Sequence, residues 1–261
     1  MELYEEIKEL VNKKEFILAD EKMSYLLSML TPKYKEQIGK QFSFNHILEV
    51  YYYDYFLNHE EDILHTDINL NAYYRLFGFL KMQLKKYEGA VTAYEIAINW
   101  NPVDLDSMFQ LGELYKSLGN LDACKKITDR AYNFCCTRVT LARYYRNLGF
   151  YYLEKYQPQI ATALYQYSNI YSSSKQADNE LYYLQKALKR PTPNLSIQDM
   201  QIILAKENIP VGPNSDTIGI AYRVGQLELE KGNKDNARDC FTMVYDLTLD
   251  DEVNFILQKL Q

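Results

Sequence analysis

A set of small and apolar residues in the middle of the chain recurs at an interval of 34 residues. Phe77-Gly78 is followed 34 positions later by Leu111-Gly112, and Ala97 is matched in the same way by Ala131. A fixed period of this size is typical of repeat architectures, in which each unit buries its apolar face only against its neighbours. The period therefore predicts an array of like units rather than one central core.

Each of these units has the pattern of two helices joined by a short turn. In the first, the spacing predicts a helix over 71–84, a turn at Lys85-Lys86-Tyr87 and a second helix that Asn101-Pro102 ends. Proline stops the second helix because it cannot continue the backbone hydrogen bonding and disfavours helical geometry in the residue before it. Glycine at Gly78 and Gly112 lets two helix backbones approach where a larger side chain would hold them apart.

The spacing resembles the tetratricopeptide repeat, whose signature is W-x2-L-G-x2-Y, then A-x3-F-x2-A and a proline. Four stretches carry the resemblance: Tyr74-x2-Phe77-Gly78 with Ala90-x3-Tyr94-x2-Ala97 and Pro102, Met108-x2-Leu111-Gly112-x2-Tyr115 with Cys124-x3-Thr128-x2-Ala131, Tyr145-x2-Leu148-Gly149-x2-Tyr152 with Ala161-x3-Tyr165, and Ala221-x2-Val224-Gly225 with Ala237-x3-Phe241. The resemblance implies an all-α fold, an α-solenoid of about seven antiparallel helical hairpins and a C-terminal capping helix, wound as a right-handed superhelix.

We expect a single helical repeat domain over 1–261, with a regular block flanked by less regular parts. Degenerate hairpins are predicted over 1–69, the regular block over 71–171, degenerate helices over 172–208, and the last unit with its cap over 214–261. In the first part, Thr31-Pro32 is interpreted as the start of a new helix, and a Tyr-rich helix near 45–58 is expected to be buried on several sides. The segment 209–214 is the strongest break and could be a hinge or a rigid bend.

The composition indicates a folded, soluble protein and excludes several classes of partner. The net charge is −6, so the chain carries no overall electrostatic signature of nucleic-acid binding. The N-terminal residues are acidic, unlike a signal peptide, and no apolar stretch approaches the ~20 residues that span a bilayer. The 25 tyrosines are interpreted as packing between helices. We expect a cytoplasmic protein with no nucleic-acid or membrane partner.

The four cysteines predict neither a disulfide framework nor a C-x-x-C site. Cys124 and Cys240 occupy helical positions that expect a small buried residue. Cys135-Cys136 could form a strained vicinal disulfide, but reduced thiols are favoured in a cytosolic chain.

Signs of catalysis or of a metal site are few. His59 and His65 lie near acidic residues but lack the i, i+4 histidine pair that binds zinc on one helix face, so an acidic loop is favoured. Phosphate-binding and hydrolase motifs are absent from the sequence. Trp100 is interpreted as a packing anchor at an inter-repeat turn. We therefore predict no enzyme activity, no cofactor and no metal.

The resemblance implies a binding surface, because the first helix of each tetratricopeptide hairpin lines the concave face. Carried over by register, with Ala72 and Asp106 beside them, the candidate partner-binding residues are Arg75, Phe79, Met82, Phe109, Gln110, Glu113, Lys116, Arg143, Arg146, Asn147, Phe150 and Glu154. Phe79, Phe109 and Phe150 would form a row of stacking platforms. Arg143 and Arg146 share a helix face and could grip a carboxylate with forked hydrogen bonds. The alternative is that these side chains pack against the next repeat or form surface ion pairs.

Some members of the family clamp a C-terminal carboxylate with Lys, two Asn, Lys and Arg. The corresponding residues here would be Arg75, Phe79, Gln110, Arg143 and Asn147, which keep two basic residues but not the asparagine pattern, so we do not expect this clamp.

Three functions follow in order of preference. The first is a non-catalytic adaptor or scaffold that binds a protein or extended peptide in its concave groove. The second is a peptide-sensing regulator whose superhelical curvature changes on ligand binding. The third is an enzyme or enzyme subunit with an active site in the N-terminal region.

Overall fold

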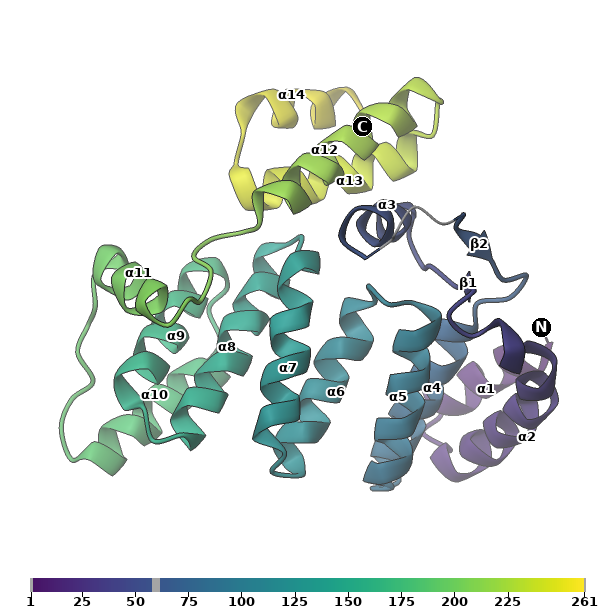
Figure 1. Ribbon diagram of the computed structural model, residues 1–261, viewed down its shortest axis with the longest axis horizontal. Coiled ribbons are helices and arrows are strands. Elements are labelled where there is room, and N and C mark those ends of the chain that lie inside the picture. The colour runs from purple at the N-terminus through teal and green to yellow at the C-terminus, as the bar shows by residue number, and fades with distance from the viewer. Residues whose placement is uncertain (1, 58–61, 261) are drawn as a thin grey trace. The chain divides into compact units, whose positions relative to one another are not determined.

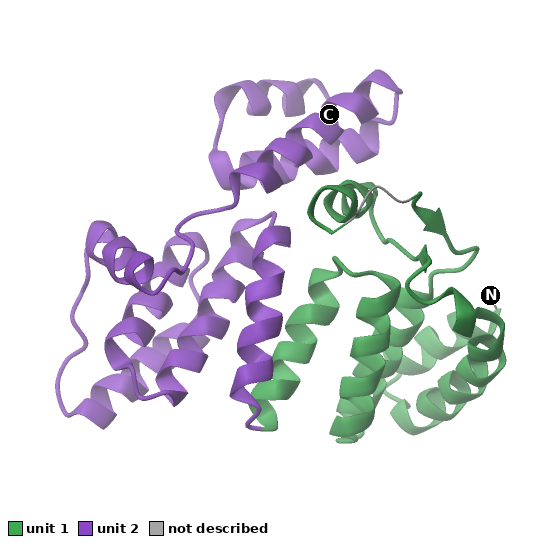
Figure 2. Cartoon of the chain, in the orientation of Figure 1, with its two compact units in different colours: residues 1–118 green, residues 119–261 purple. Residues whose placement is uncertain are grey.

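The computed structural model describes residues 2–57 and 62–260, and the chain divides into two compact units, Met1–Leu118 and Gly119–Gln261 (Figure 2). The expectation of a single domain over 1–261 stays a prediction.

Unit 1 is built from helices, with two very short strands, one on each side of the third helix in the sequence (Figure 1). Its α-helices are α1 (Glu2–Asn12), α2 (Phe16–Tyr34), α3 (Ile47–Phe56), α4 (Leu70–Gln83), α5 (Tyr87–Trp100) and α6 (Leu105–Ser117). A 3₁₀ turn follows α2 at Lys35–Gln37, and the strands are β1 (Gln41–Phe42) and β2 (Leu64–His65), which pair in parallel.

Unit 2 contains only helices and loops among the residues that are described. Its α-helices are α7 (Leu121–Ala131), α8 (Arg138–Glu154), α9 (Pro158–Tyr171), α10 (Lys175–Leu188), α11 (Ile197–Lys206), α12 (Ser215–Glu230), α13 (Lys234–Thr248) and α14 (Asp251–Lys259). A 3₁₀ turn, Tyr132–Phe134, follows α7. The predicted fold class, an all-α helical repeat, is confirmed.

Helices that are consecutive in sequence pack against each other as pairs. Such pairs are α1 with α2 and α4 with α5 in unit 1, and α8 with α9 and α12 with α13 in unit 2. Both α10 and α11 pack against α9, and α14 packs on α13. The helix predicted over 71–84 and the capping helix near the C-terminus are both present as α4 and α14.

Three of these pairs are held together by the same contact between a glycine and an aromatic ring. A Cβ placed on Gly78 of α4 would lie 2.8 Å from the ring of Tyr94 in α5. The equivalent distances are 3.0 Å from Gly149 to Tyr165 and 3.1 Å from Gly225 to Phe241. The predicted reason for glycine is therefore confirmed at Gly78, and the same contact occurs at Gly149 and Gly225: the ring of the second helix lies directly on the backbone of the first.

The segment between α2 and α4 differs from the prediction. We expected a new helix to start at Pro32, but α2 continues through Pro32 to Tyr34. Proline removes only one hydrogen bond there, and it lies exposed in the last turn, where water can reach the free carbonyl. The segment then adds a single α-helix, α3, and two strands in place of a hairpin.

The expected burial of the Tyr-rich helix on several sides was wrong. Of the aromatic residues in α3, only Tyr52 is buried, and Tyr55 is 59% exposed. The carboxylate of Glu49 instead anchors α3, since it accepts hydrogen bonds from the Asn45 backbone amide at 2.6 Å and the Asn101 side chain at 2.8 Å. Burial raises the pKa of Glu49.

The break at 209–214 has the contacts of a rigid bend rather than those of a free hinge. The hydroxyl of Tyr145 on α8 lies 3.1 Å from the Pro210 carbonyl oxygen and accepts a hydrogen bond from the Gly212 amide at 3.0 Å. The Tyr132 hydroxyl donates to the Gly212 carbonyl at 3.1 Å. These partly buried hydrogen bonds restrain the backbone between the two prolines, Pro210 and Pro213.

The remaining side chains behave largely as the sequence predicts. Trp100 is buried and packs edge-on against Tyr34, with ring centroids 6.4 Å apart. All four cysteines are free, and Cys124 and Cys240 are buried. Among the described residues, none of the helices is both long and apolar enough to cross a membrane.

Candidate functional site

A pocket of about 370 Å³ opens on unit 1 beside the first helix of the first regular hairpin. We call it the groove pocket, and it is lined by Tyr4, Lys8, Ala72, Arg75, Leu76, Phe79, Tyr94, Asp106 and Gln110. Five of these residues, Ala72, Arg75, Phe79, Asp106 and Gln110, were assigned to the inward face from the repeat register alone. The structure therefore brings together inward positions from two successive repeats, which lie up to 38 residues apart in the sequence.

An ion-pair network fixes the position of Arg75 in this pocket. Its Nη1 lies 3.2 Å from a carboxylate oxygen of Asp104 and 3.2 Å from one of Asp106. Asp104 is itself buried and also accepts a hydrogen bond from Asn71 at 2.9 Å. Because Asp104 is held by the fold, the guanidinium is oriented before any ligand binds.

Sequence reasoning missed the contribution of α1 to the groove pocket. The Tyr4 hydroxyl donates to the carbonyl oxygen of Ala72 at 3.3 Å, and its ring stacks on Tyr73 with centroids 4.0 Å apart. Burial raises the pKa of Tyr4 to about 12, so its hydroxyl stays protonated. Lys8, one turn further along α1, adds a half-exposed ammonium at 5.3 Å from the Tyr4 ring. The only sequence signal for these contacts was the helical spacing of Tyr4 and Lys8.

The other candidates in unit 1 are engaged in local contacts. Met82 accepts a hydrogen bond from the Tyr94 hydroxyl at 3.6 Å, and Lys116 pairs with Glu113 at 2.9 Å. Phe79 is half-buried and meets Phe16 edge-on at 6.1 Å. Phe109 is only 2% exposed. A stacking platform needs a free ring face, so Phe109 does not suit that role.

The candidates in unit 2 lie on α8, and the side chain of Arg146 already makes a hydrogen bond within unit 2. Arg146 donates from Nη1 to the carbonyl oxygen of Ser172 at 3.2 Å, directly after α9. This contact satisfies a backbone carbonyl at a helix end, so Arg146 acts as a C-terminal cap. Asn147 is buried, whereas Arg143 and Phe150 are half-buried. The forked grip of Arg143 and Arg146 on a carboxylate stays a prediction.

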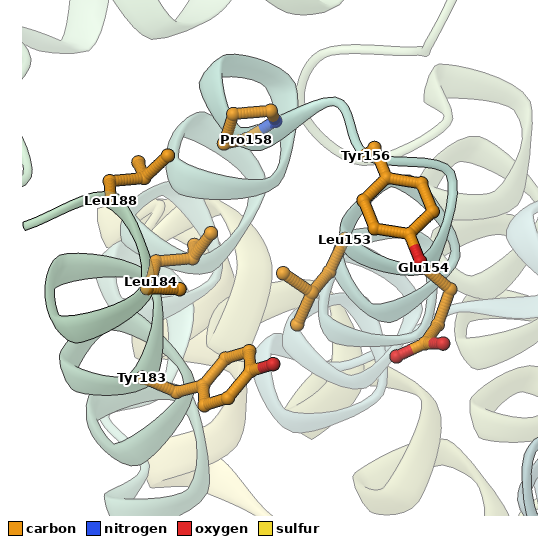
Figure 3. A pocket seen from close by; sticks show the side chains of 8 residues that line it. Leu153, Glu154, Tyr156, Pro158, Tyr183, Leu184 and Leu188 are labelled. Atoms are coloured by element: carbon orange, nitrogen blue, oxygen red, sulfur yellow. The ribbon is translucent and has the colours of Figure 1, made fainter.

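A second pocket of about 370 Å³ lies in unit 2, where α8 ends and α9 begins (Figure 3). We call it the α8–α10 pocket, and its lining residues are Leu153, Glu154, Tyr156, Pro158, Tyr183, Leu184, Ala187 and Leu188. In Figure 3, Leu184 and Leu188 of α10 lie on one side of the pocket, and Tyr156 and Glu154 lie on the opposite side. Of the predicted residues, only Glu154 is here. The sequence signal for this pocket, which the repeat register does not include, was the aromatic residue Tyr156 in the turn after α8.

Metal-ligating clusters and reactive thiols are the groups that would indicate chemistry among the described residues. Within residues 2–57 and 62–260, no group of three or more His, Cys, Asp and Glu side chains is placed to hold a metal ion. His59 lies outside the described residues. Burial raises the pKa of the Cys240 thiol to about 12, which keeps it protonated and poorly nucleophilic near neutral pH.

Comparison with known proteins identifies one repeat directly. Residues 105–133 match the family model of the tetratricopeptide repeat. A solved tetratricopeptide repeat protein from Parabacteroides merdae is similar over 99% of this chain and 97% of its own, with 15% identity and a TM-score of 0.40. YrrB, described as a tetratricopeptide repeat protein with an unusual peptide-binding site, is similar over 72% of this chain and 91% of its own, with 14% identity and a TM-score of 0.36. No curated protein matches the chain.

Proposed function

We propose that this chain, which contains a tetratricopeptide repeat over residues 105–133, is a non-catalytic adaptor that binds a protein or an extended peptide on the inward face of its first helices. The groove pocket carries this proposal. It is the place where inward residues from two repeats, predicted independently of any structure, line one open cavity.

The lining of the groove pocket suits a peptide with polar and apolar contacts. The Arg75 guanidinium is held in place by Asp104, the Gln110 amide can donate and accept, and the half-buried Phe79 ring offers an apolar surface. Oriented polar groups set among apolar walls are typical of ligand sites, where they select the orientation of the bound chain. The volume of about 370 Å³ is enough for one or two side chains rather than for a whole domain.

The proposed partners follow from the surface charge. With a net charge of −6, the chain has no general attraction for nucleic acid or for anionic membrane surfaces. A cytoplasmic protein or peptide remains the proposed partner class.

Exchange of two groove residues tests the proposal. Phe79→Ala and Gln110→Ala together should weaken binding of peptides selected from a displayed octapeptide library by at least tenfold. The matched control is Gln83→Ala with Phe255→Ala, which changes the same residue types at exposed positions outside the groove pocket. If the groove variant folds, as judged by circular dichroism, and every selected peptide binds it as tightly as the parent, the groove pocket is not the binding site.

A further inference from the structure

The α8–α10 pocket combines an apolar floor with exposed aromatic side chains at its rim. Its floor consists of Leu153 and Leu184, while Tyr156 is 93% exposed and Tyr183 is 59% exposed (Figure 3). The volume, about 370 Å³, lies at the lower end of the ~300–1,000 Å³ that ligand pockets occupy. Exposed apolar side chains gathered around a hollow mark interaction surfaces more often than isolated ones do.

The backbone of Tyr156 is unusual for its position. It has a φ of 57° in the turn between α8 and α9, a left-handed conformation that bulky residues rarely adopt. The corresponding turns of other hairpins use Gly119 and Gly232, or Lys14 and Lys85. Since the Tyr156 ring is almost wholly in solvent, its packing within unit 2 does not explain an aromatic residue there.

The charged side chains at the rim of the α8–α10 pocket indicate the sign of the charge that a ligand would carry. Glu154 is exposed and has no ion-pair partner among the interactions described for unit 2. The neighbouring Lys155 is directed to Asp122 at 3.4 Å, and Lys186 lies over the Tyr182 ring at 5.1 Å. A carboxylate beside an apolar floor favours a cation beside an apolar side chain.

We propose that the α8–α10 pocket is a second docking site, separate from the groove pocket, for a short segment of a partner protein. The segment presents a Leu or an aromatic side chain, with Lys or Arg within two positions of it. The apolar side chain enters between Leu153 and Leu184, the Tyr156 ring covers it, and the cation pairs with Glu154. Central apolar anchors with charged neighbours at the rim are the usual arrangement of such interfaces.

A pocket-filling variant provides the selective test. Ala187 lines the pocket on the exposed side of α10, so Ala187→Phe should occupy the space without disturbing buried side chains. A displayed octapeptide library is first depleted on the full chain carrying Ala187→Phe, then selected on the parent chain. The recovered peptides should share an apolar residue with Lys or Arg close by. Their affinity, measured by fluorescence anisotropy, should fall at least tenfold in Ala187→Phe and change less than twofold in Ala205→Phe, an exposed alanine on α11.

Charge reversal tests the role of Glu154 in a way that a purely structural role cannot imitate. Glu154→Lys should weaken binding at least tenfold, and a peptide whose Lys or Arg is replaced by Glu should bind this variant at least tenfold better than the original peptide does. Glu230→Lys, at another exposed position of unit 2, is the matched control.

Three outcomes overturn the proposal. No peptide survives the depletion, or the recovered peptides lack the basic residue, or charge reversal gives no rescue. A dimer in sedimentation that Ala187→Phe dissociates would show instead that a second copy of this chain occupies the pocket. Peptides that bind only the groove pocket are removed by the depletion step, so failure here leaves the proposed function separately testable.

Discussion

The contact between Gly78 and Tyr94 predicts how much the free energy of unfolding changes when Gly78→Ala adds one methyl group. The Cβ of Gly78→Ala would lie 2.8 to 2.9 Å from three atoms of the Tyr94 ring, closer than real contacts of this kind. The ring is 1% exposed, and its hydroxyl donates to Met82, so it cannot swing out into solvent. Overpacking of this kind costs about 1–3 kcal/mol, whereas alanine gains about 1 kcal/mol over glycine in a helix. The net expectation is a destabilisation of up to about 2 kcal/mol.

The same substitution at an open position should have the opposite sign. Gly219 lies in α12, where an added Cβ meets no atom within 4 Å, so Gly219→Ala should stabilise by about 0.5–1 kcal/mol. Urea unfolding measures both changes in the free energy of unfolding. Circular dichroism follows Gly219→Ala. Fluorescence of Trp100 follows Gly78→Ala, because Trp100 is the single tryptophan and lies in unit 1 with Gly78. If Gly78→Ala stabilises the chain as much as Gly219→Ala does, the Tyr94 ring does not require the glycine and the packing argument fails.

Three further predictions concern unit 2. Tyr145→Phe removes the hydroxyl that bonds to both sides of the 209–214 bend, so it should destabilise by about 1–3 kcal/mol and speed hydrogen exchange of the Gly212 amide; unchanged protection of that amide would contradict the bend. Hydrogen bonds from Asn236, Lys231 and Asn233 lower the pKa of Glu228 to about 2 from an ordinary value of 4.5. Its stabilisation should therefore be complete above pH 4.5 and be lost as the pH falls toward 2, and Glu228→Gln, measured by urea titration, should reduce that pH dependence. Tyr156→Gly relieves a positive φ and should raise the free energy of unfolding by up to about 1 kcal/mol, whereas an unchanged or lower value would show that the turn is not strained.

Several parts of this structure follow from short-range signals in the sequence. The glycine positions and the helix-ending proline each report on residues within one hairpin, so their effect does not depend on distant contacts. Register then placed Arg75, Phe79 and Gln110 on one face, because successive repeats present equivalent residues in equivalent places.

Other parts depended on contacts that no local pattern encodes. Packing between elements decides that Glu49 is buried and that α2 continues through Pro32. Local propensity alone predicted that a new helix starts at Pro32. Arg146 illustrates the limit at a site, since its partner is a backbone carbonyl 26 residues away. A side chain that the repeat register assigns to a surface can instead form a hydrogen bond with a nearby backbone group that has no partner.

The sequence by itself therefore determined the helical hairpins, their repeat and which residues of α4 share the face that lines the groove pocket, because these arise from spacing within about 34 residues. Only the tertiary structure decided that α1 lines part of the groove pocket, that Tyr145 restrains the 209–214 bend, and that α8 and α10 line a second pocket. The physical reason is that burial and hydrogen bonding between distant segments depend on where whole helices pack, and that placement is a property of the folded chain.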